Sequence, residues 1–274
     1  MGLLFKIPPG NGHRSVFEPG EHSIRWLGLD ILRLEAGENW HGDMDEEEAT
    51  LVILSGRCTI SVIGEETVKW EGLGGRGDVF SGSPTAMYAP RQSRLEVTAG
   101  SRLELTIVKA PCEVSLSPTV ITPGDVQPVS VGMMNWQRDV RPIIPPGSPV
   151  SQRLIVGETL NPPGNWSGIP PHKHDETSDV ENQLEEFYLF KTKPSDGYAV
   201  QLVYDDDGGQ GYIVGNDDVM IFPSSYHPTV APPGTTVYYL WALAGDNKDY
   251  QITTDPRFSW VGRAEAVLKE MQHR

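Results

Sequence analysis

The sequence predicts an all-β protein that ends in a short helix. Glycine and proline are abundant, with 29 and 23 copies in 274 residues, against a combined average usage of roughly 12%. They are spread between short apolar runs, a distribution that is typical of many turns joining many strands. The hydrophobic content of 38% is enough to build a core.

Strand signals follow one another along the chain. Residues 94–97 and 102–108 alternate polar and apolar side chains, as half-buried strands do. Three largely apolar runs, at 51–54, 200–204 and 237–243, are typical of buried strands. A helical spacing of apolar residues occurs at the C-terminus, where Ala264, Val267, Leu268 and Met271 fall at i, i+3, i+4 and i+7.

The order of these signals is repeated. In each half a strand leads to histidine and an acidic run, and then to a second strand, a turn with aspartate, and a proline. The repeat spans more than ~100 residues and therefore predicts a duplicated domain rather than a solenoid. We expect an N-terminal domain over 1–120 and a C-terminal domain over 121–274, joined by the Pro-, Ser- and Thr-rich segment 111–131.

One cluster of residues in the second half carries metal-binding chemistry. His172 and His174 stand at i and i+2, which places both rings on one face of an extended strand. A carboxylate follows at Glu185 or Glu186, and a third histidine, His227, follows later. Three imidazoles and one carboxylate suit Zn, Mn, Fe, Ni or Co with open coordination positions. Because neighbouring strand residues point in opposite directions, only one of the two glutamates can face the ion.

These residues resemble a known family. The His-x-His motif, the following glutamate and the later histidine resemble the metal motif of the cupins, and the duplicated layout resembles a bicupin of two jelly-roll β-barrels or sandwiches. More specifically, Pro-Gly-Asn-Trp-Ser at 163–167, Pro-Pro-His-Lys-His-Asp at 170–175 and Leu-Glu-Glu-Phe-Tyr at 184–188 resemble the 5-deoxy-glucuronate isomerases of myo-inositol catabolism. The neighbouring 4-deoxy-L-threo-5-hexosulose-uronate ketol-isomerases share the metal set but lack the Gly-Asn-Trp-Ser approach.

The resemblance implies an aldose–ketose isomerase that interconverts 5-deoxy-D-glucuronate and 5-dehydro-2-deoxy-D-gluconate. It also implies one divalent metal ion per chain, held by His172, His174, Glu185 and His227, since the usual cupin pattern favours Glu185 over Glu186. Whether a proton moves through an enediol or a hydride shifts directly stays open. The sequence has no Gly-rich dinucleotide loop and no phosphate loop, so we expect no organic cofactor.

Further candidates surround the metal motif. Glu186, Tyr188 and Tyr226 flank the predicted ligands and are candidate catalytic groups. A uronate substrate needs a cation for its carboxylate, and the candidates are Arg138, Arg153 and Lys173. Lys173 lies between the two histidines, so on a strand it would point away from them.

The first half departs from this motif. His41 stands alone, and the segment 84–88 has no histidine where the second half has His227. We therefore expect the N-terminal domain to lack a full set of metal ligands.

The net charge limits the partners. With 22 Lys and Arg against 37 Asp and Glu, the formal charge is −15, which argues against nucleic acid and anionic membranes as partners. An anionic substrate then requires a locally positive pocket.

The two cysteines, Cys58 and Cys112, are expected to be buried and unpaired, and no secretory signal is recognisable, so we expect a cytoplasmic protein. A homodimer is the expected oligomeric state. The alternative functions are a 4-deoxy-L-threo-5-hexosulose-uronate ketol-isomerase, a non-catalytic sugar-acid-binding cupin and an iron dioxygenase.

Overall fold

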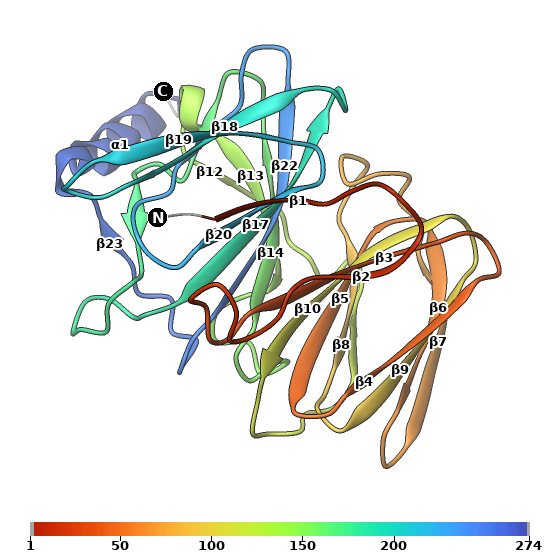
Figure 1. Cartoon of the computed structure of the whole chain (residues 1–274). Coiled ribbons are helices and arrows are strands. Elements are labelled where there is room, and N and C mark those ends of the chain that lie inside the picture. The colour runs from red at the N-terminus through yellow and green to blue at the C-terminus, as the bar shows by residue number, and fades with distance from the viewer. Residues whose placement is uncertain (1–2, 273–274) are drawn as a thin grey trace.

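The computed structural model describes residues 3–272 and consists of strands almost throughout (Figure 1). Two β-sandwich halves lie side by side, with the first half drawn in red to yellow and the second in green to blue. The predicted all-β architecture with one C-terminal helix is confirmed.

The first half consists of two antiparallel sheets. The six-stranded sheet has the order β11-β8-β5-β10-β3-β2 and the four-stranded sheet has the order β4-β9-β6-β7. Alternate residues such as Leu51 and Ile53 fill the space between the sheets. The strands are β2 (Gly12–Phe17), β3 (Gly28–Leu34), β4 (Asn39–Met44), β5 (Glu47–Ser55), β6 (Arg57–Ile63), β7 (Thr67–Gly74), β8 (Thr85–Ala89), β9 (Ser93–Ala99), β10 (Leu103–Pro111) and β11 (Thr119–Ile121).

The second half repeats this plan. A seven-stranded sheet, β1-β20-β17-β22-β14-β13-β12, faces a four-stranded sheet, β15-β21-β18-β19, and β16 pairs with β23. Aromatic side chains such as Tyr188 and Phe190 fill its interior. The strands are β1 (Leu3–Lys6), β12 (Val129–Val131), β13 (Arg138–Ile144), β14 (Ile155–Asn161), β15 (Trp166–Ser167), β16 (His172–Lys173), β17 (Glu185–Lys193), β18 (Tyr198–Tyr204), β19 (Gly209–Gly215), β20 (Asp218–Phe222), β21 (Thr229–Val230), β22 (Thr236–Ala244) and β23 (Thr253–Thr254).

The two large sheets pack against each other and form a third apolar core. Leu29 and Ile31 of β3 and Phe187 and Leu189 of β17 belong to it. The N-terminal strand β1 crosses from the first half to the second, where it pairs with β20 (Figure 1). The predicted boundary between residues 120 and 121 falls within β11, the edge strand of the first half, and stays a prediction.

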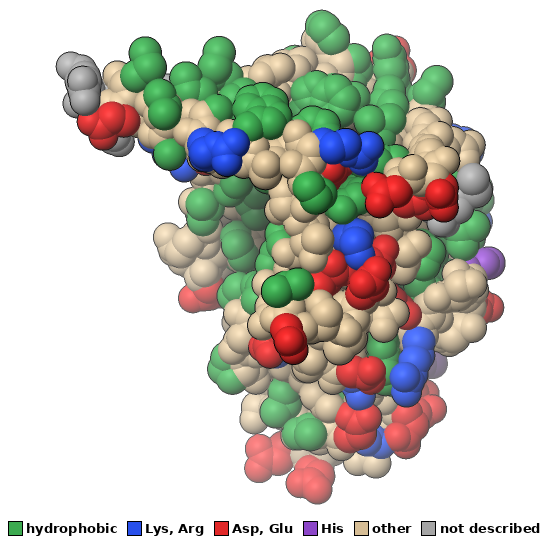
Figure 2. Space-filling view, turned by 90° about the vertical axis from the view of Figure 1, so that its left-hand side faces the viewer, with side chains coloured by type: hydrophobic (Ala, Val, Ile, Leu, Met, Phe, Trp, Pro, Cys, Tyr) green, Lys and Arg blue, Asp and Glu red, His purple; other side chains and the backbone are tan. Residues whose placement is uncertain are grey.

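The predicted C-terminal helix is α1 (Trp260–Gln272), preceded by the 3₁₀ turn η2 (Pro256–Phe258); a second 3₁₀ turn, η1 (Met134–Trp136), precedes β13. The helix lies at the margin of the second half, so its apolar stripe is only partly covered: Val261 is buried but Val267 is 60% exposed. No helix within residues 3–272 is long and apolar enough to cross a membrane. On the face in Figure 2, Lys and Arg lie singly or in small groups beside acidic side chains.

Candidate metal centre

Three histidines and one glutamate from separate segments meet inside the second sandwich. His172 lies on β16, and His174 is the first residue after that strand. Glu186 is the second residue of β17, and His227 lies between β20 and β21. The Glu186 Oε2 atom is 3.1 Å from His174 Nε2 and 2.9 Å from His227 Nε2. The ring centre of His172 is 5.4 Å from that of His227 and 6.3 Å from that of His174.

Backbone carbonyls fix the tautomer of all three rings. The Nδ1 atom of His172 lies 3.3 Å from Pro170 O, that of His174 lies 2.7 Å from Leu184 O, and that of His227 lies 2.8 Å from Ser225 O. A carbonyl oxygen can only accept, so each Nδ1 carries the hydrogen and each Nε2 keeps its lone pair, as metal-binding histidines require.

The arrangement fits a cation at the centre of the cluster. The Nε2 atom of His227 is buried and has no hydrogen-bond partner in the part of the chain described, although a Glu186 oxygen is 2.9 Å away. Two electron-rich atoms this close repel each other unless a positive charge lies near both. The potential ligand atoms of His174, Glu186 and His227 all lie within 4.8 Å of one another, so a divalent ion fits the donor set.

The electrostatics favour the metal-binding protonation states of two of these residues, His172 and Glu186. Burial, together with the charges of the other two histidines, lowers the pKa of His172 to about 3. Burial would raise the pKa of Glu186, but the neighbouring His174 and His227 outweigh burial and hold this pKa at about 2. At neutral pH His172 is therefore neutral and Glu186 ionised, which are the metal-binding forms.

The expectation that Glu185 faces the metal is wrong. Its carboxylate points to the opposite side of β17 and accepts hydrogen bonds from the backbone N–H groups of Arg25, at 2.5 Å, and Trp26, at 2.7 Å. Glu186 takes the position among the histidines instead. The two glutamates point to opposite faces of β17, as predicted, but the face that each one occupies is the reverse of the prediction.

The first half contains the matching contact. Glu48, at the start of β5, accepts hydrogen bonds from the N–H groups of Gln152, Arg153 and Leu154 just before β14. Glu185 does the same for the residues just before β3. These two glutamates, called the reciprocal clasp below, tie each half to the other. The sequence signal for this contact is a glutamate at the beginning of the corresponding strand in each half, Glu48 in β5 and Glu185 in β17.

A cavity of about 460 Å³ adjoins the metal cluster. Its wall includes His172, Glu186, Tyr188 and Arg138. The Arg138 guanidinium donates to two backbone carbonyls; within residues 3–272 no carboxylate forms an ion pair with it. The cavity therefore offers a free cation close to the cluster, as the acidic composition requires for an anionic substrate.

Comparison with known proteins now places the chain. Residues 9–261 match the KduI/IolB family. The chain belongs to the KduI/IolB family. A curated member, the 5-deoxy-glucuronate isomerase of Geobacillus kaustophilus (strain HTA426), is 34% identical over 276 residues, which cover 98% of this chain and 99% of that protein. The 5-deoxy-glucuronate isomerase of Bacillus subtilis (strain 168) is 31% identical over 271 residues, covering 95% and 99%.

Solved structures agree with this KduI/IolB assignment. The crystal structure of an IolB-like protein from Salmonella typhimurium LT2 superposes with a TM-score of 0.90 at 29% identity, covering 95% of this chain and 99% of that one. The oxalate decarboxylase of Lactobacillus farciminis has a TM-score of 0.67 at 12% identity, covering 92% and 88%, and shows a shared fold alone. The predicted duplicated cupin fold is confirmed.

Two of the three predicted substrate-binding cations of this KduI/IolB member lie outside the cavity. Arg153 is buried between the halves, where it donates to Gly245 O and pairs with Glu113. Lys173 points away from the histidines, as strand alternation predicted, and pairs with Asp175 and Glu181. Arg138 alone of the three lines the cavity.

The predicted tyrosines also separate. Tyr188 lines the cavity and stacks on Tyr239, with ring centres 4.4 Å apart. Tyr226 packs against Tyr204 and is absent from the cavity wall. Sequence reasoning missed Tyr250, whose hydroxyl lies 3.4 Å from His172 Nε2. Nothing in the irregular segment around Tyr250 marks it, because the loop that carries it reaches the site only in the folded chain.

The first half lacks a carboxylate at the position that matches Glu186. Among residues 3–272 the only group of three or more potential ligands is the one in the second half. When the halves are matched through the clasp residues Glu48 and Glu185, the residue that follows is Ala49 in the first half and Glu186 in the second. A methyl group thus stands where the second half has a carboxylate.

Proposed function

We propose that this protein interconverts 5-deoxy-D-glucuronate and 5-dehydro-2-deoxy-D-gluconate with the help of one divalent metal ion. The observation that carries the proposal is the buried group of His174, Glu186 and His227, with the His172 ring beside it. It adjoins a cavity that contains Arg138, in a family whose curated members are named for this reaction. His172, His174, Glu186 and His227 would hold the ion.

The reaction needs no external oxidant. A hydrogen leaves the carbon that bears a hydroxyl and joins the neighbouring aldehyde carbon, while the hydroxyl proton passes to the aldehyde oxygen. A divalent ion supplies Lewis acidity toward the carbonyl, and Zn, Mn, Fe, Ni or Co suits this donor set. No organic cofactor is called for.

The chain's own residues bind and orient the substrate. Arg138 offers its guanidinium to the uronate carboxylate, an interaction that fixes both position and direction. Burial raises the pKa of Tyr188 well above 10, and burial likewise raises the pKa of Tyr250. Both phenols therefore stay protonated and can donate hydrogen bonds to substrate oxygens.

A non-catalytic cupin is the competing class. A purely structural metal site is usually closed by protein ligands, whereas a catalytic site keeps an open position. The cavity beside the cluster supports the catalytic interpretation. Isomerisation of 4-deoxy-L-threo-5-hexosulose-uronate and an oxygen-dependent reaction are alternatives that the same experiment separates.

The test is an NMR assay with metal-loaded protein on both deoxy-uronates, run with and without oxygen. We expect turnover of 5-deoxy-D-glucuronate alone, independent of oxygen. His227→Ala and Glu186→Gln should lose bound metal and activity together, whereas Glu185→Gln and the exposed Glu176→Gln should retain metal. Unchanged 5-deoxy-D-glucuronate with fully loaded protein would refute the proposal.

We further propose a cytoplasmic location and a small anionic sugar acid as the partner. Both cysteines, Cys58 and Cys112, are buried and free, which suits a reducing compartment. A homodimer stays a proposal that light scattering can test.

A further inference from the structure

A second cavity, of about 700 Å³, lies between the two halves and is separate from the metal centre. On β17 the wall residue Lys191 follows Glu186 by five positions, which corresponds to about 17 Å along the strand. An odd spacing also places the two side chains on opposite faces of the sheet. A ligand here would therefore not compete with a substrate at the metal cluster.

Five of the 22 Lys and Arg residues line this cavity, against two acidic residues. This is a local excess of positive charge in a protein of net charge −15. The cations are Arg33, Arg57, Arg76, Arg102 and Lys191, and the acids are Glu104 and Asp217.

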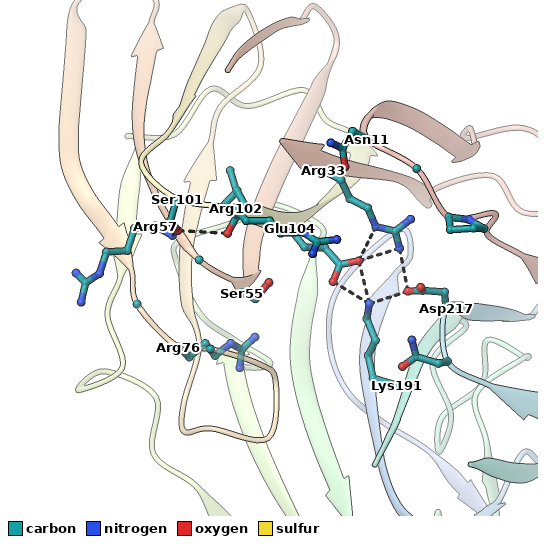
Figure 3. A pocket seen from close by; sticks show the side chains of 17 residues that line it. Asn11, Arg33, Ser55, Arg57, Arg76, Ser101, Arg102, Glu104, Lys191 and Asp217 are labelled. Atoms are coloured by element: carbon teal, nitrogen blue, oxygen red, sulfur yellow. Dashed lines mark hydrogen bonds and ion pairs between the residues drawn. The ribbon is translucent and has the colours of Figure 1, made fainter. Parts of the chain in front are cut away.

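Three of these cations are already neutralised. Arg33 and Lys191 form a closed network with Glu104 and Asp217, with nitrogen–oxygen distances between 2.6 and 3.0 Å. Arg76 is buried and makes two hydrogen bonds to the Glu158 carboxylate behind the wall. Figure 3 shows the four-charge network at one end of the cavity and Arg57 at the other.

Two arginines remain available. Within residues 3–272 Arg57 has no ion pair, and Arg102 has only a 3.9 Å contact with Glu35, in which both side chains are more than half exposed. The turns that carry the two arginines are held together, because Arg57 N donates to Ser101 Oγ at 2.9 Å and Gly100 N donates to Arg57 O at 2.8 Å. This contact holds the backbones of the two arginines close together. In Figure 3 the Arg57 side chain points away from the charge network, but both side chains are exposed, so both could turn toward one ligand bound between the turns.

We propose that this cavity binds a small phosphorylated, hydroxyl-bearing metabolite. A phosphate monoester carries about −1.5 to −2 charges at neutral pH, which matches two free guanidinium groups better than a single carboxylate does. Arginine presents a fork of donors suited to phosphate oxygens. The volume far exceeds that of a phosphate group, and Asn11, Ser55 and Asn216 offer polar groups for the rest of the molecule. The proposal does not depend on the isomerase activity.

The experiment is thermal unfolding of the intact protein with inorganic phosphate, glucose 6-phosphate and glucuronate in separate arms, at constant ionic strength. We expect glucose 6-phosphate to raise Tm by about 3–5 °C at ten times its Kd, and to do so more than inorganic phosphate. The double variant Arg57→Gln/Arg102→Gln should lose the shift. Arg94→Gln/Arg263→Gln, which makes the same change in net charge away from the cavity, should keep it.

Four outcomes would overturn the proposal. The first is the absence of a shift with either phosphate compound, and the second is an equal shift with glucuronate. The third is an undiminished shift in Arg57→Gln/Arg102→Gln. The fourth is loss of the shift in Glu186→Gln, which would place the phosphate at the metal centre. Isothermal titration of the folded double variant separates lost binding from lost stability.

Discussion

The reciprocal clasp makes a sharp prediction for Glu48→Ala. The Glu48 side chain is fully buried. It accepts hydrogen bonds from the N–H groups of Gln152 at 2.7 Å, Arg153 at 2.6 Å and Leu154 at 3.0 Å, and from the Tyr88 hydroxyl at 2.9 Å. Alanine would leave all four donors without an acceptor in a region that excludes water.

The expected loss follows from these four contacts. A hydrogen bond to a charged acceptor contributes about 1.5–3 kcal/mol, and a neutral one about 1 kcal/mol. Partial entry of water recovers some of the loss, so we expect Glu48→Ala to cost about 4–6 kcal/mol. For a chain of this size that is a fall in Tm of roughly 8–20 °C. Glu185 accepts only two hydrogen bonds, both from backbone N–H groups, and is half-buried. Glu185→Ala should therefore lower the free energy of unfolding by about 2 kcal/mol.

Urea unfolding followed by circular dichroism measures both values, with the exposed Glu65→Ala as a control that should stay within about 0.5 kcal/mol of the wild type. The reasoning is refuted if Glu48→Ala loses less than about 1 kcal/mol, or if Glu185→Ala loses more than Glu48→Ala.

Three further predictions follow from the cavity and the interface. Arg138→Gln should raise KM for the uronate about 10–100-fold while kcat changes little, because a charge-assisted pair is lost; steady-state NMR kinetics measure this. Tyr250→Phe should lower kcat severalfold with an unchanged metal content by elemental analysis, since only a hydroxyl beside His172 is removed. The charges of Lys191 and Arg33 outweigh burial and lower the pKa of Glu104, so its contribution to stability is present above pH about 4.5 and is lost as pH falls through the lowered value. Glu104→Gln should therefore show a smaller stability difference between pH 7 and pH 4 in urea titrations.

Much of this protein can be predicted from local sequence patterns. Alternation and turn residues predict the strands, because a strand with one solvent face must alternate. The spacing of His172 and His174 predicts that they share a face and that Lys173 points away from them, which depends only on backbone geometry. The repeated order of signals predicts two similar halves, because each half builds its own sandwich.

Only the packing of the two large sheets decided which glutamate reaches the histidines. Both faces of β17 are buried, one against the interior of its own sandwich and the other against the first half. A strand buried on both sides carries no polar face to reveal its phase, so Glu185 and Glu186 look alike in the sequence. The same long-range packing carries Arg153 into the interface, brings Tyr250 to the cluster and forms the cavity between the halves. These contacts join segments distant in sequence, and no local pattern encodes the distances between them.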